Sequence, residues 1–142
     1  MSERGTSERA NVTAGSAWIH QIRVRYGDCD MQRVVFNAHY LAYCDDAVEQ
    51  WLAAKGVQVN DVGWDFMLKK STIEWQGTAT VHETIDIAVE VSRWGNTSFD
   101  VLFTGTVGGR AVFTNTITYV GVRLGTLETM PPPEDVKRIL SA

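Results

Sequence analysis

The chain has 142 residues, of which 44% are hydrophobic and 21% charged, and it carries a formal net charge of −4 with a pI near 5.3. These values are ordinary for a globular protein of one domain, and the acidic balance argues against nucleic acid as the main partner. No apolar run approaches the roughly 20 residues of a membrane span, and the polar start lacks the apolar region of a signal peptide. We therefore expect a disordered tail over residues 1–16, a single domain over residues 17–142, no membrane partner, and a cytoplasmic location.

The first predicted element is a strand over residues 17–26, where apolar and polar side chains alternate. Gly27 then releases the chain into an acidic loop that contains Asp28 and Asp30. Two carboxylates just before a helix lie close to the unpaired N–H groups at its positive end. A carbonyl placed there would meet an acid or base on one side and main-chain donors on the other.

A long helix is predicted from Ala38 to about Ala54, with Asn37 as its N-cap and Gly56 as its C-terminal stop. Apolar residues cover most of its circumference, and the polar strip is limited to Asp45, Asp46, Glu49 and Gln50. A helix this apolar is enclosed on several sides. The segment 56–65 is predicted to be a connecting loop.

Four strands and a short helix follow. The strands are predicted over residues 66–76, 84–94, 98–107 and 111–122, and the helix over 134–140 after a run of prolines. Tight-turn residues separate the last three strands, so these strands are antiparallel. The sequence thus predicts an α+β fold in which one antiparallel sheet packs around one helix.

Metal and cysteine chemistry are not expected. Cys29 and Cys44 form no metal-binding or disulfide pattern, and the three histidines are scattered. Cys29 stands between two acids, which disfavour its thiolate. Taken alone, Asp28 and Asp30 are also typical turn or cap residues.

The acidic loop and the helix resemble the signature of the 4-hydroxybenzoyl-CoA thioesterase family. The similar residues are Arg25-Tyr26-Gly27-Asp28-Cys29-Asp30, Val34-Val35-Phe36-Asn37-Ala38-His39-Tyr40 and Trp51-Leu52, with a smaller echo at Trp94 and Ser98-Phe99. The resemblance spans about residues 22–140. It implies the hotdog fold, a long central helix wrapped by a curved antiparallel sheet of about five strands. It also implies an acyl-CoA thioesterase that works as a homodimer or homotetramer, with active sites between subunits.

The resemblance also implies roles for individual residues. The family's catalytic aspartate falls on Asp30, as nucleophile or general base, and the backbone N–H that polarises the thioester carbonyl falls on Asn37. Asp28 is expected to be structural. Substrate contacts are expected from the loop, the helix and two strands, at Arg33, Val35, Phe36, His39, Asp45, Arg93 and Ser98. No metal or cofactor is implied, because coenzyme A is part of the substrate.

Two departures from the family pattern stand out. Arg33 replaces the usual glycine three residues after the catalytic aspartate, and arginine adopts positive φ less cheaply than glycine. Arg33 would then distort the loop, pair with Asp30, or contact a phosphate. The basic cluster that some members carry before Ser98 is absent, which leaves a sparser set for the CoA phosphates: Arg93, Arg110, Arg123, Lys137 and Arg138.

Two other functions remain open on the sequence. Arg33 is compatible with a non-catalytic protein that binds acyl-CoA and has lost turnover. A hotdog dehydratase or hydratase is disfavoured, because the loop has no histidine in place of Asp30. The acyl group itself, whether aromatic, short or long, is not readable from the sequence.

Overall fold

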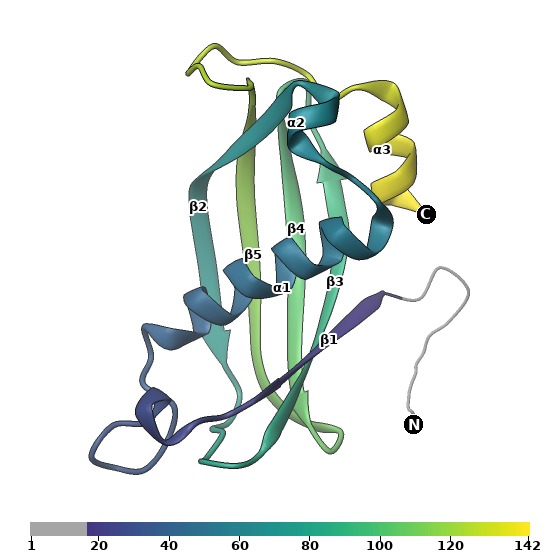
Figure 1. The fold of residues 1–142 in the computed structure, drawn as a ribbon. Helices are drawn as coiled ribbons and strands as arrows, with labels where there is room; N and C mark the ends of the chain where they lie inside the picture. The colour runs from purple at the N-terminus through teal and green to yellow at the C-terminus, as the bar shows by residue number, and fades with distance from the viewer. Residues whose placement is uncertain (1–16) are drawn as a thin grey trace.

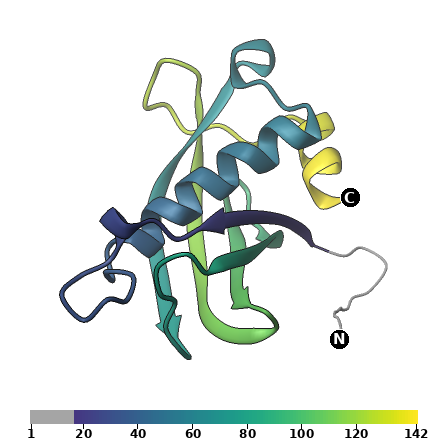
Figure 2. The same ribbon diagram turned by 60° about the horizontal axis from the view of Figure 1, so that its bottom comes forward.

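The computed structural model describes residues 17–142. Within them, five antiparallel strands form one curved sheet in the order β1-β3-β4-β5-β2. The sheet wraps around the long helix α1 (Figures 1 and 2). In chain order the elements are β1 (Trp18–Arg23), the 3-10 helix η1 (Tyr26–Asp28), α1 (His39–Lys55), α2 (Val59–Val62), β2 (Trp64–Trp75), β3 (Thr84–Trp94), β4 (Ser98–Val107), β5 (Arg110–Arg123) and α3 (Glu134–Ser141). The predicted hotdog architecture is confirmed.

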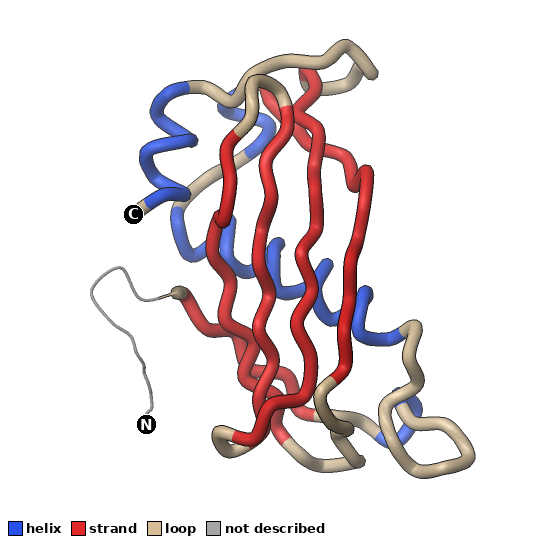
Figure 3. Tube along the Cα trace, turned by 180° about the vertical axis from the view of Figure 1, so that it is seen from behind, coloured by secondary structure: helices blue, strands red, loops and turns tan. Residues whose placement is uncertain are grey.

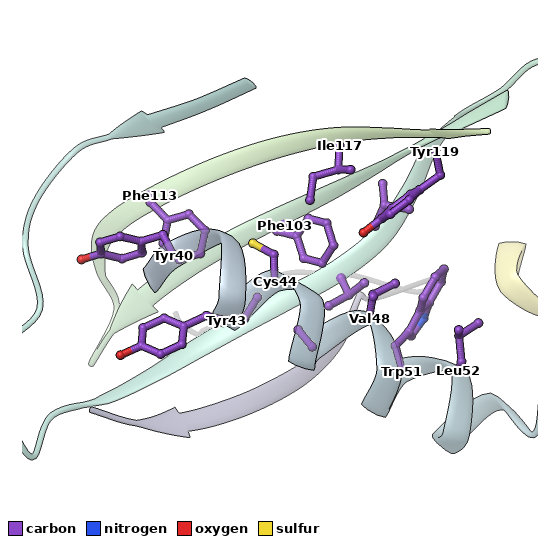
Figure 4. Packing of buried hydrophobic residues seen from close by; sticks show 14 of the residues in the cluster. Tyr40, Tyr43, Cys44, Val48, Trp51, Leu52, Phe103, Phe113, Ile117 and Tyr119 are labelled. Atoms are coloured by element: carbon purple, nitrogen blue, oxygen red, sulfur yellow. The ribbon is translucent and has the colours of Figure 1, made fainter. Parts of the chain in front are cut away.

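The core lies between the concave face of the sheet and α1. Strand residues at every second position point toward the helix, because successive side chains of a strand alternate between its two faces. Figure 4 shows Tyr40, Cys44, Val48 and Trp51 of α1 packed over the sheet. The strands contribute buried side chains that include Ile85, Ile87, Phe99, Val101, Phe103, Phe113 and Ile117.

Strand β1 is shorter than predicted. It ends at Arg23 because its partner β3 begins at Thr84, and Arg23 and Thr84 are the last residues paired. The alternation that continues to Tyr26 is therefore misleading, since the Tyr26 side chain is 86% exposed in η1. In the segment predicted to be a loop, α2 forms over Val59–Val62 and β2 begins at Trp64.

Gly56 ends α1 as predicted. Its φ of 76° is left-handed, and its N–H donates to the carbonyl oxygens of Ala53 and Leu52. The other end of the helix differs from the prediction, because the N-cap is Ala38 and no side chain caps it. Asn37 lies in a preceding turn, and its carbonyl oxygen accepts the N–H of Tyr40.

The edge strand β2 is unusually exposed. Met67, Leu68 and Trp75 are 49%, 44% and 43% exposed, although they lie on both faces of the strand. Figure 3 shows the outer face of the sheet with α1 behind it and no described helix in front. Among the helices of residues 17–142, none is both long and apolar enough to cross a membrane.

Candidate active site at the start of the central helix

The acidic loop is a small hydrogen-bonded hairpin. Cys29 and Val35 form an isolated antiparallel bridge, and the N–H of Asp30 donates to the carbonyl oxygen of Val34 at 3.0 Å. The N–H of Arg33 returns to the carbonyl oxygen of Asp30 at 2.9 Å. Asp30 is therefore the first residue of a tight turn, and main-chain hydrogen bonds within the loop hold its conformation.

Arg33 occupies the left-handed position of this turn, with φ of 66°. Tight three-residue hairpins usually end in such a residue, which explains why glycine suits this place. A non-glycine residue adopts this conformation at a cost of about 1–2 kcal/mol. Arg33 therefore adopts the left-handed conformation that glycine favours at this place, and the turn forms around it. No ion pair joins Arg33 to Asp30, although both belong to the described part of the chain.

Asp30 is exposed, and one of its carboxylate oxygens accepts a hydrogen bond. Its Oδ1 accepts the N–H of Gln32 at 2.8 Å, the usual contact of an aspartate that opens a turn. For Oδ2 no hydrogen-bond donor is found among residues 17–142. The turn contact thus orients the carboxylate and leaves its second oxygen for another group.

Asp28 is the buried anchor of the loop, as expected for a structural residue. The residue is 2% exposed, and its carboxylate accepts hydrogen bonds from the main-chain N–H of Arg25 at 3.0 Å and the Tyr43 hydroxyl at 2.9 Å. The Arg25 guanidinium adds two more, at 3.1 and 3.4 Å. Burial opposes ionisation, but the Arg25 and Tyr43 hydrogen bonds and the Arg25 charge outweigh it, so the pKa of Asp28 lies below its usual value.

The start of α1 is tied to the same loop. The N–H of Phe36 donates to the Asp28 carbonyl oxygen at 2.9 Å, and the Phe36 carbonyl oxygen accepts the N–H of His39. Asn37 follows directly, and no acceptor for its N–H is found within the described chain. This N–H stands just before the first turn of α1, and the start of a helix is a region that favours negative charge. The predicted side-chain cap at Asn37 is wrong, because Ala38 already has helical dihedral angles and the chain turns before the helix begins.

Of the predicted substrate contacts, those of the loop lie together. Phe36 is 50% exposed and packs edge-on against His39, which in turn stacks on the buried Tyr43. Val35 differs, because only 3% of it is exposed and its N–H is bonded to Ala79. Val35 therefore belongs to the core and packs beneath the exposed residues of the loop. Asp45 lies further along α1, where burial and then Glu49 raise its pKa.

Ser98 and Arg93 lie at the other end of the sheet. Their side chains bond to each other at 3.1 Å, and Arg93 also pairs with Asp100. The loop pairs with Thr80, just before β3 begins, whereas Arg93 and Ser98 flank the turn after β3. Ten steps along a strand span about 33 Å. These two residues therefore do not meet Asp30 within one chain.

The environment of Cys29 disfavours its thiolate. Burial, and then Asp28 and Asp30, raise the pKa of Cys29, so its thiol is a poor nucleophile. No group of three or more His, Cys, Asp or Glu side chains able to hold a metal occurs in residues 17–142. Tyr43 was missed as a site residue, because its helical spacing predicts only a core position and the contact with Asp28 spans 15 residues.

Solved structures with the same fold include several thioesterases. A thioesterase superfamily protein from Jannaschia sp. is 17% identical, with a TM-score of 0.84 over 93% of this chain and 96% of its own. A 4-hydroxybenzoyl-CoA thioesterase variant in complex with 4-hydroxybenzoyl-CoA is 18% identical, with a TM-score of 0.80 over 89% and 99%. The 1,4-dihydroxy-2-naphthoyl-CoA thioesterase from Synechocystis is 16% identical, with a TM-score of 0.77 over 87% and 95%.

No curated protein sequence matches the chain. Its family is nevertheless shown, because residues 24–140, most of the chain, match the family described as the thioesterase-like superfamily. The family resemblance predicted a thioester hydrolase, and this match supports that class of enzyme. The chain belongs to the thioesterase-like superfamily.

Proposed function

We propose that this protein hydrolyses an acyl-CoA thioester to the free acid and CoA, with Asp30 and the Asn37 N–H as the reacting groups. One observation carries the proposal. A hydrogen-bonded turn holds Asp30 by one oxygen, and the same loop leads into a helix whose preceding N–H has no acceptor in the described chain. Hydrolysis of a thioester requires few further catalytic groups, because its thiolate is a good leaving group. No metal or cofactor takes part in the proposed reaction.

The reaction can follow two routes. As general base, Asp30 takes a proton from water while the water oxygen attacks the carbonyl carbon; the intermediate then collapses and expels the CoA thiolate. As nucleophile, Asp30 attacks the carbon directly, releases the thiolate, and forms an anhydride that water cleaves. In both routes the carbonyl oxygen becomes negative and accepts the Asn37 N–H. General bases typically contribute about 10²–10⁴ in rate, and one preorganised oxyanion donor about 2.7–4 kcal/mol.

The variant Asp30→Asn tests the assignment cleanly. Asparagine keeps an Oδ1 that can accept the N–H of Gln32, so the turn survives while the base is lost. We expect thiol release to fall by at least about 10²-fold with unchanged folding. Asp61→Asn, on the exposed surface of α2, is the matched control. Hydrolysis by Asp30→Asn at the wild-type rate would contradict the proposal.

The acyl group is to be identified with benzoyl-, short-chain and long-chain CoA esters and detection of the released thiol. Binding of these esters without hydrolysis would instead support a non-catalytic acyl-CoA-binding protein. That alternative depends on a loop altered by Arg33. The loop, however, keeps its hydrogen-bonded turn with Arg33 in place. Hydrolysis is therefore the function that the geometry supports better.

We further propose that two copies pair through β2. An edge strand with exposed apolar side chains is a ready surface for a second strand, and a two-fold axis would pair β2 with itself in antiparallel fashion. The Trp75 end of β2, beside the acidic loop, would then adjoin the Trp64 end of the partner's strand, which lies at the Ser98 end of its sheet. Such a homodimer, or a tetramer of two, would bring Arg93 and Ser98 of one copy toward Asp30 of the other. Light scattering coupled to size exclusion tests this, and a monomer at micromolar concentration would contradict it.

The cytoplasmic location stays a prediction from the sequence.

A further inference from the structure

Two loops beside the candidate site share an unusual backbone feature. Within residues 17–142, Arg33 and His82 are the non-glycine residues with positive φ, at 66° and 73°. Their loops are neighbours, because Val34 forms an antiparallel bridge with Thr80. Figure 1 shows the acidic loop and the β2–β3 connection at the same end of the sheet. Strained residues concentrate at functional sites, and both of these side chains are exposed.

Arg33 also differs from most arginines of the described chain in having no carboxylate beside it. Five others are ion-paired: Arg25 with Asp28, Arg93 with Asp100, Arg110 with Glu83, Arg123 with Glu128 and Arg138 with Asp135. Arg23 and Arg33 have no such partner within residues 17–142. Most of the arginines expected to bind CoA phosphates are thus occupied by acids of the same chain.

Arg23 is joined to His82 instead. Its guanidinium lies 3.2 Å from Nδ1 of the ring, and the N–H of His82 donates to the carbonyl oxygen of Val24 at 2.9 Å. A guanidinium only donates hydrogen bonds, so Nδ1 accepts and the ring hydrogen lies on Nε2. The pair therefore offers the remaining N–H groups of Arg23 and the Nε2–H of His82 to one acceptor-rich group.

We propose that Arg23, Arg33 and His82 bind the phosphates of the CoA moiety, on the same subunit that supplies Asp30. This inference rests on the proposed function and adds the position of the nucleotide end of the substrate. Guanidinium groups match phosphate oxygens with paired hydrogen bonds, and a protein of net charge −4 needs local cations to hold a polyanion. The CoA phosphates would then lie beside the acidic loop and the β2–β3 connection. They would not lie beside the Gly95–Thr97 turn, which has no basic residue.

The test measures the binding of free CoA and of pantetheine, which has the same thiol arm without phosphates, by calorimetry. The variants are Arg33→Gly, which also relaxes the turn, and Arg23→Gln; Lys55→Gln, at the C-terminal end of α1, is the control. We expect CoA to bind about tenfold more weakly to each variant and about a hundredfold more weakly to the double variant. Pantetheine binding should not change, and the loss should shrink at high ionic strength.

Three outcomes would overturn the inference: unchanged CoA binding, an equal loss with pantetheine, or an equal loss in Lys55→Gln. None of these concerns hydrolysis, so the proposed function would stand if wild type still releases thiol and Asp30→Asn does not. Conversely, wild-type hydrolysis by Asp30→Asn would remove the proposed mechanism while leaving the CoA-binding result to be judged by itself. A wild-type protein that neither binds CoA nor cleaves its esters would refute both.

Discussion

The hydrogen bond between Tyr43 and Asp28 joins the central helix to the acidic loop, so its removal tests whether that contact holds the site. The Tyr43 hydroxyl is 2.9 Å from Oδ2 of Asp28, a residue that is 2% exposed. Tyr43→Phe removes the hydroxyl alone and keeps the ring, which packs edge-on against Tyr40. Asp28 retains its contacts with Arg25, so we expect the fold to persist.

The magnitude follows from the charge of the acceptor. Hydrogen bonds to charged groups contribute about 1.5–3 kcal/mol, compared with about 0.5–1.5 kcal/mol for neutral pairs. We therefore expect Tyr43→Phe to lower the free energy of unfolding by about 2 kcal/mol near neutral pH.

The loss should depend on pH. The folded pKa of Asp28 lies below its ordinary value of 3.8, so its charged contacts stabilise the protein above that value. This stability disappears as the pH falls through the folded pKa. Without the hydroxyl, the folded pKa moves back toward the ordinary value, and acid unfolding begins at a higher pH. The difference between wild type and variant should then shrink below about pH 4.

Urea unfolding at about pH 7 and about pH 3 provides the measurement. Tyr26→Phe is the control, because the Tyr26 side chain is 86% exposed and no hydrogen bond of its hydroxyl is found in the described chain. A loss below about 0.5 kcal/mol, or one that is the same at both pH values, would refute the reasoning.

Three further predictions concern backbone, packing and thiols. Arg33→Gly should raise the free energy of unfolding by about 0.5–1 kcal/mol, because relief of positive φ exceeds the entropy that glycine adds to the unfolded chain; a loss of stability in urea would show that the arginine is not strained. Gly105→Ala should cost about 1–3 kcal/mol in the same assay, because the new Cβ would overlap the Phe113 ring, and a neutral result would mean that the core yields there. Cys44 should resist iodoacetamide in the folded protein at about pH 8, because burial raises the pKa of its thiol to about 12; labelling as fast as in urea would contradict this.

Much of the fold could be read from local patterns. The strands β3 and β4 have the predicted bounds, since tight turns and strict alternation mark both ends. The central helix is displaced by one residue at each end. The 4-hydroxybenzoyl-CoA thioesterase resemblance placed the acidic loop before the helix, and the structure shows it there. The catalytic roles of Asp30 and Asn37 stay predictions.

The amino-acid sequence alone determined the class of fold, because period-two alternation and a long apolar helix are local properties. What only the tertiary structure decided depends on contacts between distant segments. β1 ends where β3 begins, Asp28 is anchored by Tyr43 fifteen residues away, and the Asp30 turn survives an arginine at a position suited to glycine. The structure also placed Arg93 and Ser98 far from the acidic loop of the same chain, although the family resemblance had named them with it as substrate contacts. Pairing between segments is a property of the folded chain, since residues that meet there carry no common local pattern.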